Sequence, residues 1–179
     1  MSDVISSNLS DDMKNSWGSD QNVVDALNKE FNFDLDAAAS DSNHKFDRYL
    51  TIEDDALSID WSKLWTYKQG HHFVKAVWIN PPYGRGMIKA FMNKCIEQKK
   101  KGVTSVLLVP ATLDAQWLPI NEISEIRIIT GGRLTFIHPE TNKPVAGNTK
   151  GSMFVIFRPS KMPCSVRLID RNELISSGM

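Results

Sequence analysis

Residues 73–110 read FVKAVWINPPYGRGMIKAFMNKCIEQKKKGVTSVLLVP, and they determine the class of fold. The first eight residues predict a strand, which ends at two prolines because proline has no N–H for a sheet ladder. Apolar residues then recur at helical spacing from Met87 to Ile96, and Gly102 ends the predicted helix. Residues 103–110 are almost all apolar, as in a buried parallel strand. This order of strand, helix and strand predicts an α/β fold.

The flanking sequence adds further elements. Residues 20–31 place apolar side chains at helical spacing behind Asp20, which we expect to be the N-cap. Residues 31–40 contain a short strand in which apolar side chains alternate with polar ones. Three later strands are predicted, over residues 125–130, 133–137 and 152–157, with a turn at Gly131 and Gly132 between the first two. We therefore expect a central, mostly parallel sheet with antiparallel hairpins at its C-terminal end.

Length and composition indicate an ordinary globular protein. The chain has 179 residues, of which 41% are hydrophobic and 23% are charged. We expect residues 1–15 to form a flexible polar tail and residues 16–179 to form a single domain. No apolar run approaches the ~20 residues of a membrane span, and the start has no signal-peptide pattern, which favours the cytoplasm. Cys95 and Cys164 lie far apart, so we expect free thiols and no metal site.

Charge is divided unevenly along the chain. The net charge is zero, but residues 1–60 hold only four of the 21 basic residues and fourteen of the 21 acidic ones. An excess of basic residues in the remainder can mark a face that binds nucleic acid. The alternative is that the two parts mix in space when the chain folds.

The segment Asn80–Tyr83, NPPY, carries the strongest chemical signal. Ligands of open parallel sheets bind beyond the carboxyl ends of the strands, and this segment follows a strand. The side chain of Asn80 and the carbonyl of Pro81 can accept both protons of an amino group, which frees its lone pair to attack an electrophilic methyl group. Pro82 stiffens the segment, and Tyr83 offers a flat face for stacking a base. A stiff turn without a catalytic role is the alternative.

The NPPY segment is one of a series of weak motifs. The series runs Trp17, FDLDAAAS, YLTIEDDALSIDW, NPPYG, LLVPA, Asp114 with Trp117, GGRLTF and KGSMFVIF. In this order it resembles the phage-type (Dam-like) DNA N6-adenine methyltransferases over residues 17 to about 158. The chain departs from that family at WGSD, where members commonly have W-x-T-P, and at Thr112, where they often have arginine.

The resemblance implies a fold, a reaction and a cofactor. The fold would be Rossmann-like, and the reaction would transfer a methyl group from S-adenosylmethionine to N6 of adenine in double-stranded DNA. Asp36 matches the first acidic motif and would contact the cofactor, and Asp55 would meet its adenine amino group, with Asp54 as the alternative. The remaining expected cofactor contacts are Trp17, Ala37 and Ala38. If the gene belongs to a phage or prophage, the enzyme would work in the cytoplasm of the bacterial host.

Duplex DNA hides the amino group of adenine within the base stack. The enzyme would have to flip the base out, which costs a few kcal/mol. Contacts from Lys and Arg to phosphates would offset that cost. The candidates for these contacts are Arg85, Arg133, Lys143 and Lys150, and the polar loop 138–150 could itself touch DNA.

Other functions remain open on the sequence. NPPY also serves enzymes that methylate guanine in RNA or glutamine in proteins, so amino-group chemistry alone does not select DNA. A catalytically inactive, DNA-binding relative of a methyltransferase is another alternative. An interaction protein without enzymatic activity is a third, for which no residue gives positive evidence. The sequence defines no oligomeric state.

Overall fold

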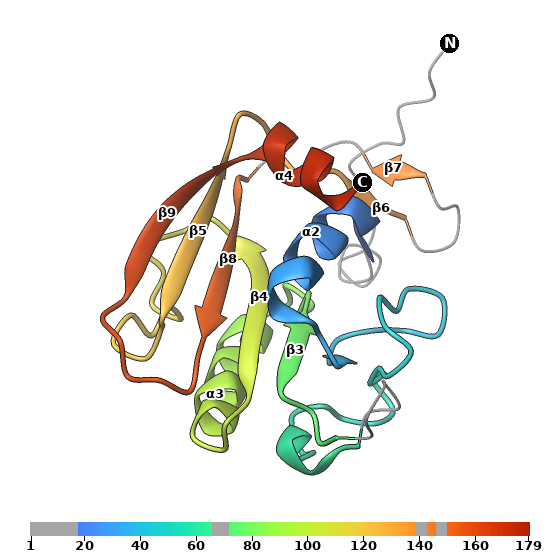
Figure 1. The fold of residues 1–179 in the computed structure, drawn as a ribbon, viewed down its shortest axis with the longest axis vertical. Helices are drawn as coiled ribbons and strands as arrows, with labels where there is room; N and C mark the ends of the chain where they lie inside the picture. Colours follow the sequence, from blue (N-terminus) through green and yellow to red (C-terminus); the bar gives the residue numbers. More distant parts are fainter. Residues whose placement is uncertain (1–17, 66–71, 139–142, 146–149) are drawn as a thin grey trace.

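The fold is built on a six-stranded sheet among the residues that the computed structural model describes, which are 18–65, 72–138, 143–145 and 150–179 (Figure 1). In spatial order the strands are β2 (Leu35–Asp36), β3 (Ala76–Ile79), β4 (Thr104–Pro110), β8 (Ser152–Phe157), β5 (Glu125–Thr130) and β9 (Ser165–Asp170). β2, β3 and β4 are parallel, β8 is antiparallel to both of its neighbours, and β9 is parallel to β5. The predicted α/β class with a mostly parallel sheet is confirmed. The antiparallel strand expected late in the chain is β8.

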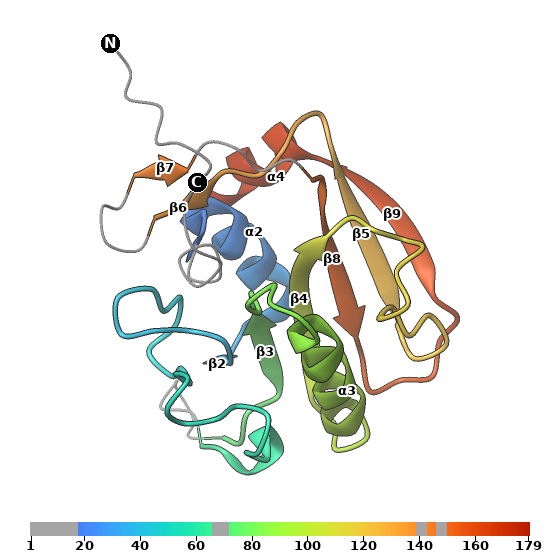
Figure 2. The same ribbon diagram turned by 180° about the vertical axis from the view of Figure 1, so that it is seen from behind.

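Helices cover both faces of this sheet. α3 (Met87–Lys99) lies on one face, whereas α2 (Gln21–Phe31) and α4 (Arg171–Gly178) lie on the other (Figures 1 and 2). In β4, Leu107 packs into the core on the α3 side, and Leu108 packs into the core on the α2 side. The apolar character of the central strands therefore reflects burial on both faces of the sheet.

The ends of α2 and α3 follow the signals in the sequence. Asp20 is the N-cap of α2, and its side chain accepts a hydrogen bond from the N–H of Asn22 at 3.0 Å. α3 ends at Lys99, and Gly102 follows with a φ of 89°, a conformation that favours glycine. The helices predicted within residues 20–31 and 86–102 are confirmed.

A second, smaller sheet lies beside the large one. It pairs β1 (Gly18–Ser19), β6 (Phe136–Ile137) and β7 (Pro144–Val145) antiparallel in that order, and a 3-10 helix, η1, spans Trp61–Lys63. The predicted hairpin between residues 125–130 and 133–137 is wrong, because β5 pairs with β8 and β9 while β6 pairs with β1 and β7. The two glycines between them, Gly131 and Gly132, have φ of 71° and 142° and lead the chain from one sheet to the other.

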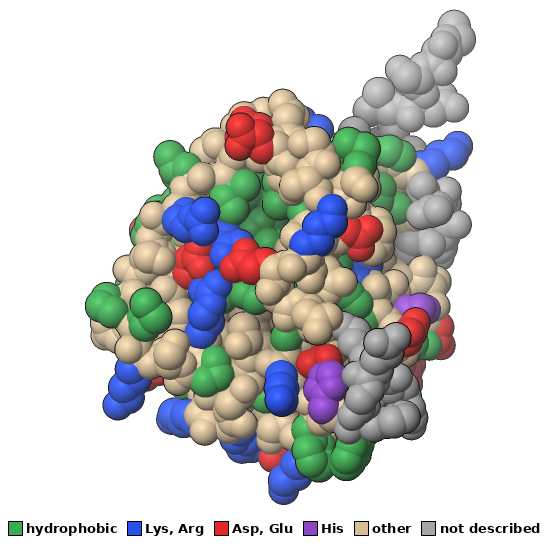
Figure 3. Space-filling model, viewed as in Figure 1, with side chains coloured by type: hydrophobic (Ala, Val, Ile, Leu, Met, Phe, Trp, Pro, Cys, Tyr) green, Lys and Arg blue, Asp and Glu red, His purple; other side chains and the backbone are tan. Residues whose placement is uncertain are grey.

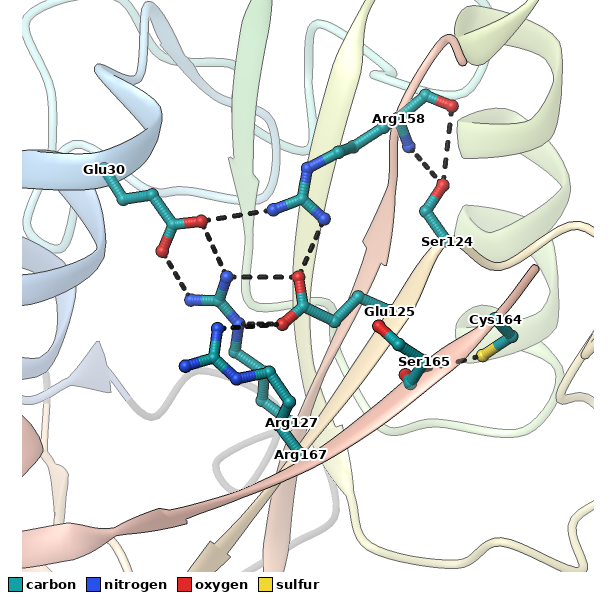
Figure 4. Close-up of polar contacts among 8 residues, drawn as sticks. All are labelled: Glu30, Ser124, Glu125, Arg127, Arg158, Cys164, Ser165 and Arg167. Carbon is teal, nitrogen blue, oxygen red and sulfur yellow. Dashed lines mark hydrogen bonds and ion pairs between the residues drawn. The ribbon is translucent and has the colours of Figure 1, made fainter. Parts of the chain in front are cut away.

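Buried ion pairs connect α2 to β5 and to the end of β8 (Figure 4). Arg127 donates to both carboxylate oxygens of Glu30, each at 2.6 Å, and to those of Glu125 at 2.8 and 3.1 Å. Arg158 bridges the same two carboxylates, at 2.8 Å to Glu125 and 3.1 Å to Glu30. Acidic and basic side chains also gather together on this face in the space-filling view (Figure 3). Here the acidic and basic parts of the chain mix, as the alternative to a segregated basic face predicted.

Neither a membrane span nor a metal cluster is present in the described residues. No helix among them has the length and apolar character needed to cross a bilayer. Within the same residues, no three His, Cys, Asp or Glu side chains gather in a way that could hold a metal ion. Cys95, which is buried, and Cys164, which is partly exposed, are free thiols. The tail 1–15 lies outside the described residues, and the single domain over 16–179 stays a prediction.

Candidate active site

A cavity of about 590 Å³ lies at the carboxyl ends of β2 and β3. Its volume is in the range of small-molecule and cofactor pockets, and its place is the one expected for ligands of parallel sheets. The wall consists of Ser19, Asp36, Ala37, Ala38, Ala39, Ser40, Asn43, Lys45, Leu50, Thr51, Ile52, Asp55, Ala56, Leu57, Trp78, Asn80, Pro82, Met87 and Phe91. The structure thus brings together six predicted site residues, which are Asp36, Ala37, Ala38, Asp55, Asn80 and Pro82.

Asp36 forms the buried, acidic end of this cavity. Its side chain is 2% exposed and accepts hydrogen bonds from the backbone N–H groups of Ala38 at 3.2 Å and Lys45 at 3.1 Å. Burial raises the pKa of this carboxyl group to about 6, and the two hydrogen bonds act in the opposite direction. The carboxyl group is therefore fixed in position and changes charge near neutral pH.

The alanines after Asp36 continue the strand pairing on both sides. The N–H of Ala37 donates to the carbonyl of Trp78 at 3.0 Å, and the N–H of Ala39 donates to the carbonyl of Leu50 at 3.0 Å. Apart from glycine, alanine has the smallest side chain, so these residues take little space in the wall. Ala37 and Ala38 therefore lie in the cavity wall, and their contact with a cofactor stays a prediction.

A short segment beside β2 brings the second acidic region to the cavity. Tyr49 forms a parallel bridge with Asp36, so the residues that follow it emerge at the carboxyl edge of the sheet. Asp54 accepts hydrogen bonds from the N–H of Thr51 at 2.8 Å and from its hydroxyl at 3.1 Å, and this carboxylate closes a turn. Asp55 lines the cavity and has a φ of 51°, which is uncommon outside glycine. The geometry favours Asp55 over Asp54 as the ligand-binding residue.

The NPPY segment follows β3 into the same cavity. Asn80 and Pro82 line the wall, whereas the ring of Pro81 is buried behind it. The hydroxyl of Tyr83 donates to the carbonyl of Leu108 at 3.3 Å and lies 3.5 Å from Oδ1 of Asn80. Burial of the hydroxyl raises the pKa of Tyr83, so the phenol stays neutral, while 37% of the residue is exposed. A protonated tyrosine with an accessible ring beside an amide acceptor can hold a flat, amino-bearing group.

Apolar side chains from α3 and from residues 50–57 form a further part of the wall. Met87 and Phe91 face the cavity from the first turns of α3, and Leu50, Ala56 and Leu57 complete the wall. An apolar wall combined with a charged end suits a ligand that has a flat ring and a charged head group.

Two residues of the cavity wall, Ser19 and Lys45, were not predicted. Ser19 reaches the cavity because β1 pairs with β6, and Lys45 because its loop folds back over Asp36. Neither belongs to a periodic pattern. The departure from the family at WGSD was the one sequence signal near Ser19.

The residues predicted to touch DNA lie on the surface. Arg85, Arg133, Lys143 and Lys150 are all exposed. Arg85 follows the NPPY segment directly, and Lys143 lies next to β7, whose partner β6 pairs with the strand that carries Ser19. Their contacts with DNA stay predictions. Trp17 and most of the loop 138–150 lie outside the described residues.

Comparison with known proteins identifies related sequences. The model of the family described as DNA N-6-adenine-methyltransferase (Dam) matches residues 6–179. A DNA N-6-adenine-methyltransferase of Escherichia phage T1 is 32% identical over 171 residues, which cover 86% of this chain and 67% of the phage protein. A protein of the same description from Haemophilus phage HP1 (strain HP1c1) is 28% identical over 182 residues, which cover 97% of this chain and 96% of the relative.

Proposed function

Since this chain belongs to the DNA N-6-adenine-methyltransferase (Dam) family, we propose that its NPPY segment holds the adenine and that S-adenosylmethionine is the methyl donor. The family and its two phage relatives establish the reaction class, methylation of adenine N6 in DNA. One observation supports the residue assignment above all others: Asn80 and Asp36 line the same cavity from the ends of adjacent strands.

The cavity has the chemical character that S-adenosylmethionine requires. Asp36 can accept from the ammonium group of the methionine part, and Asp55 can accept from the adenosine part. Met87 and Phe91 offer apolar contact for a flat ring. We assign the fold to the Rossmann-like methyltransferases, which agrees with a ligand site at the carboxyl ends of parallel strands. When bound, this cofactor supplies an electrophilic methyl group on a sulfonium.

Asn80, Pro81 and Tyr83 would prepare the adenine for attack. The side-chain oxygen of Asn80 and the carbonyl of Pro81 would accept the two amino protons, so that the nitrogen lone pair points at the methyl carbon. Tyr83 would stack on the base, and Pro82 would keep the loop rigid. Once methylated, the amino nitrogen would carry a positive charge and would release one of its protons to water. No strong general base is needed.

Access to the base requires that the adenine leave the duplex. We propose that Arg85, Arg133, Lys143 and Lys150 contact the phosphates of double-stranded DNA, because all four are exposed and cationic. The cytoplasm of a phage host is the compartment where such a substrate is found.

Transfer of labelled methyl groups tests this function. Purified protein is incubated with labelled S-adenosylmethionine and unmethylated duplex DNA, and the DNA is digested to nucleosides. We expect the label in N6-methyladenine. Label in RNA guanine or protein glutamine, offered in parallel reactions, would contradict the substrate assignment. Binding of S-adenosylhomocysteine without any transfer would indicate a catalytically inactive relative.

A further inference from the structure

The wall of the cavity contains a buried hydroxyl group, that of Ser19, to which the proposed function assigns no role. Ser19 is 2% exposed, and its side-chain oxygen has no hydrogen-bond partner among the described residues. The pairing of Ser19 with Phe136 fixes its backbone at the cavity wall. A buried polar group without a partner costs about 1–3 kcal/mol, so a ligand that hydrogen-bonds to Ser19 would be stabilised.

Lys45 adds a cation to the same cavity wall. It is half-buried in the cavity wall, and the described part of the chain gives its ammonium group no ion pair. Burial lowers the pKa of Lys45, while the charges of Asp36, Asp20 and Asp25 act in the opposite direction. The ammonium group of Lys45 can therefore donate hydrogen bonds to an anion bound in the cavity.

Asp36 and Lys45 place opposite charges side by side. The backbone N–H of Lys45 donates to one carboxylate oxygen of Asp36, and that of Ala38 donates to the other. A carboxylate has about four acceptor positions, so these two bonds leave room for a bound cation. The carboxylate of Asp36 can accept from a cation, and the side chains of Lys45 and Ser19 can donate to an anion. This combination matches a zwitterion, which is the form of an α-amino-acid group at neutral pH.

We propose that Lys45 and Ser19 bind the α-carboxylate of S-adenosylmethionine while Asp36 binds its α-ammonium group. This inference rests on the proposed methyl donor, and it adds the residues that recognise the amino-acid part. A contact of Lys45 with DNA phosphate is less compatible with its half-buried place in the cavity wall. Asp36 alone would attract the ammonium group, whereas the carboxylate needs the cation and the hydroxyl to offset its desolvation.

Calorimetric titration with two ligands tests the proposal. S-adenosylhomocysteine has the amino-acid part, and 5′-methylthioadenosine lacks it. We expect Lys45→Met to weaken binding of S-adenosylhomocysteine by about tenfold or more and to leave 5′-methylthioadenosine unchanged. Ser19→Ala should show the same selectivity with a smaller loss, and Lys45→Arg should recover part of the affinity. Lys161→Met, at an exposed position before β9, is the control and should bind both ligands like wild type.

Two results would overturn the proposal. One is wild-type protein that binds S-adenosylhomocysteine no better than 5′-methylthioadenosine. The other is a Lys45→Met variant that loses affinity equally for both ligands, or for DNA instead. Tight binding of S-adenosylhomocysteine by the wild type would leave the proposed methyl donor intact in either case. Absence of any such binding by the wild type would remove the donor and the carboxylate site together.

Discussion

Asp36 is the last residue of β2, Asn80 directly follows the adjacent parallel strand β3, and both line one cavity at the carboxyl ends of these strands. The first is a buried acid, and the second is an amide at the start of a proline-stiffened loop. This relationship places a group that can hold the cationic head of a cofactor beside a group that can hold an amino substrate.

Replacing Asn80 with alanine removes one of the two proposed amino-proton acceptors. Loss of a preorganised hydrogen-bonding group in an active site typically costs ~10²–10³ in kcat. We expect Asn80→Ala to lose at least that factor in single-turnover methyl transfer while its S-adenosylhomocysteine affinity and thermal stability stay close to wild type. Asn93→Ala, at an exposed position on α3, is the matched control. Full activity in Asn80→Ala would rule out the role assigned to the loop.

Asp54 and Asp55 have different roles in the structure, so their substitution should affect ligand affinity and stability differently. Asp54 closes a turn with Thr51, whereas Asp55 lines the cavity. We expect Asp55→Asn to weaken S-adenosylhomocysteine binding by about tenfold, the effect of losing one hydrogen bond to a charged group. Asp54→Asn should change stability by about 1 kcal/mol and affinity by less. Titration calorimetry and urea unfolding of both variants measure the two effects, and the reverse ranking of affinities would contradict the assignment.

Cofactor affinity should depend on pH through Asp36. Burial raises its pKa in the free protein to about 6, against the opposing effect of two backbone hydrogen bonds and of the nearby Lys45 and His44 side chains. Below pH 6 the carboxyl group is protonated and offers no negative charge to the ammonium group. Affinity for S-adenosylhomocysteine should therefore rise from pH 5 to pH 7, approaching tenfold for each pH unit below the pKa.

Asp36→Asn provides the control for this pH dependence. Its affinity should be lower than that of the wild type at pH 7 and nearly constant between pH 5 and pH 7, because the titrating group is gone. Calorimetry in two buffers of different ionisation enthalpy would also detect the proton that wild type releases on binding near pH 6. A wild-type profile that is flat over this range would refute the ammonium-binding role of Asp36.

Arg127 should support the fold without affecting the site. Its guanidinium group is buried between Glu30 and Glu125, and it holds the pKa of Glu125 at about 2 together with Arg158. Arg127→Met would leave a buried carboxylate without its main partner and should cost about 3–5 kcal/mol in urea unfolding. Arg167→Met removes an exposed arginine 3.5 Å from the same carboxylate and should cost less than about 1 kcal/mol. Equal losses in the two variants would contradict this account.

The sign of the pH effect follows from the lowered pKa of Glu125. Stability from these ion pairs is present above pH 4.5, the ordinary pKa, and is lost as the pH falls towards 2. Arg127→Met should therefore lose stability less steeply than wild type between pH 5 and pH 2. The affinity of Arg127→Met for S-adenosylhomocysteine at pH 7 should remain that of the wild type.

The central part of the fold could be predicted because its signals are local. Strand 73–80, helix 86–102 and strand 103–110 each carry their own apolar pattern, and parallel strands present their carboxyl ends at one edge. The resemblance to the family added the assignment of Asp36 to the cofactor, and in the structure Asp36 and Asn80 line one cavity. The sequence could not show whether Asp54 or Asp55 faces the ligand. Only the structure shows that the carboxylate of Asp54 is already hydrogen-bonded to Thr51 in a turn.

The parts that could not be predicted depend on contacts between distant segments. Ser19 reaches the cavity through a two-residue strand paired with β6, far away in the sequence. Lys45 does so through a loop without periodicity. The hairpin predicted after β5 does not form, because β5 pairs instead with β8, which comes later in the sequence. The side chains of Val166 and Leu168 in β9 are exposed. The sequence of this strand therefore lacks the apolar pattern of a buried strand, and the strand was not predicted.

The most direct test of the account is a crystal structure of the protein with S-adenosylhomocysteine and an adenine-containing DNA duplex. We predict an adenine outside the duplex, stacked on Tyr83, with its N6 atom within ~3 Å of the side-chain oxygen of Asn80 and the carbonyl of Pro81. The sulfur atom would lie on the other side of that nitrogen, in the cavity that Asp36 closes. An adenine bound elsewhere, or one whose amino group points away from Asn80, would contradict the proposed catalytic loop.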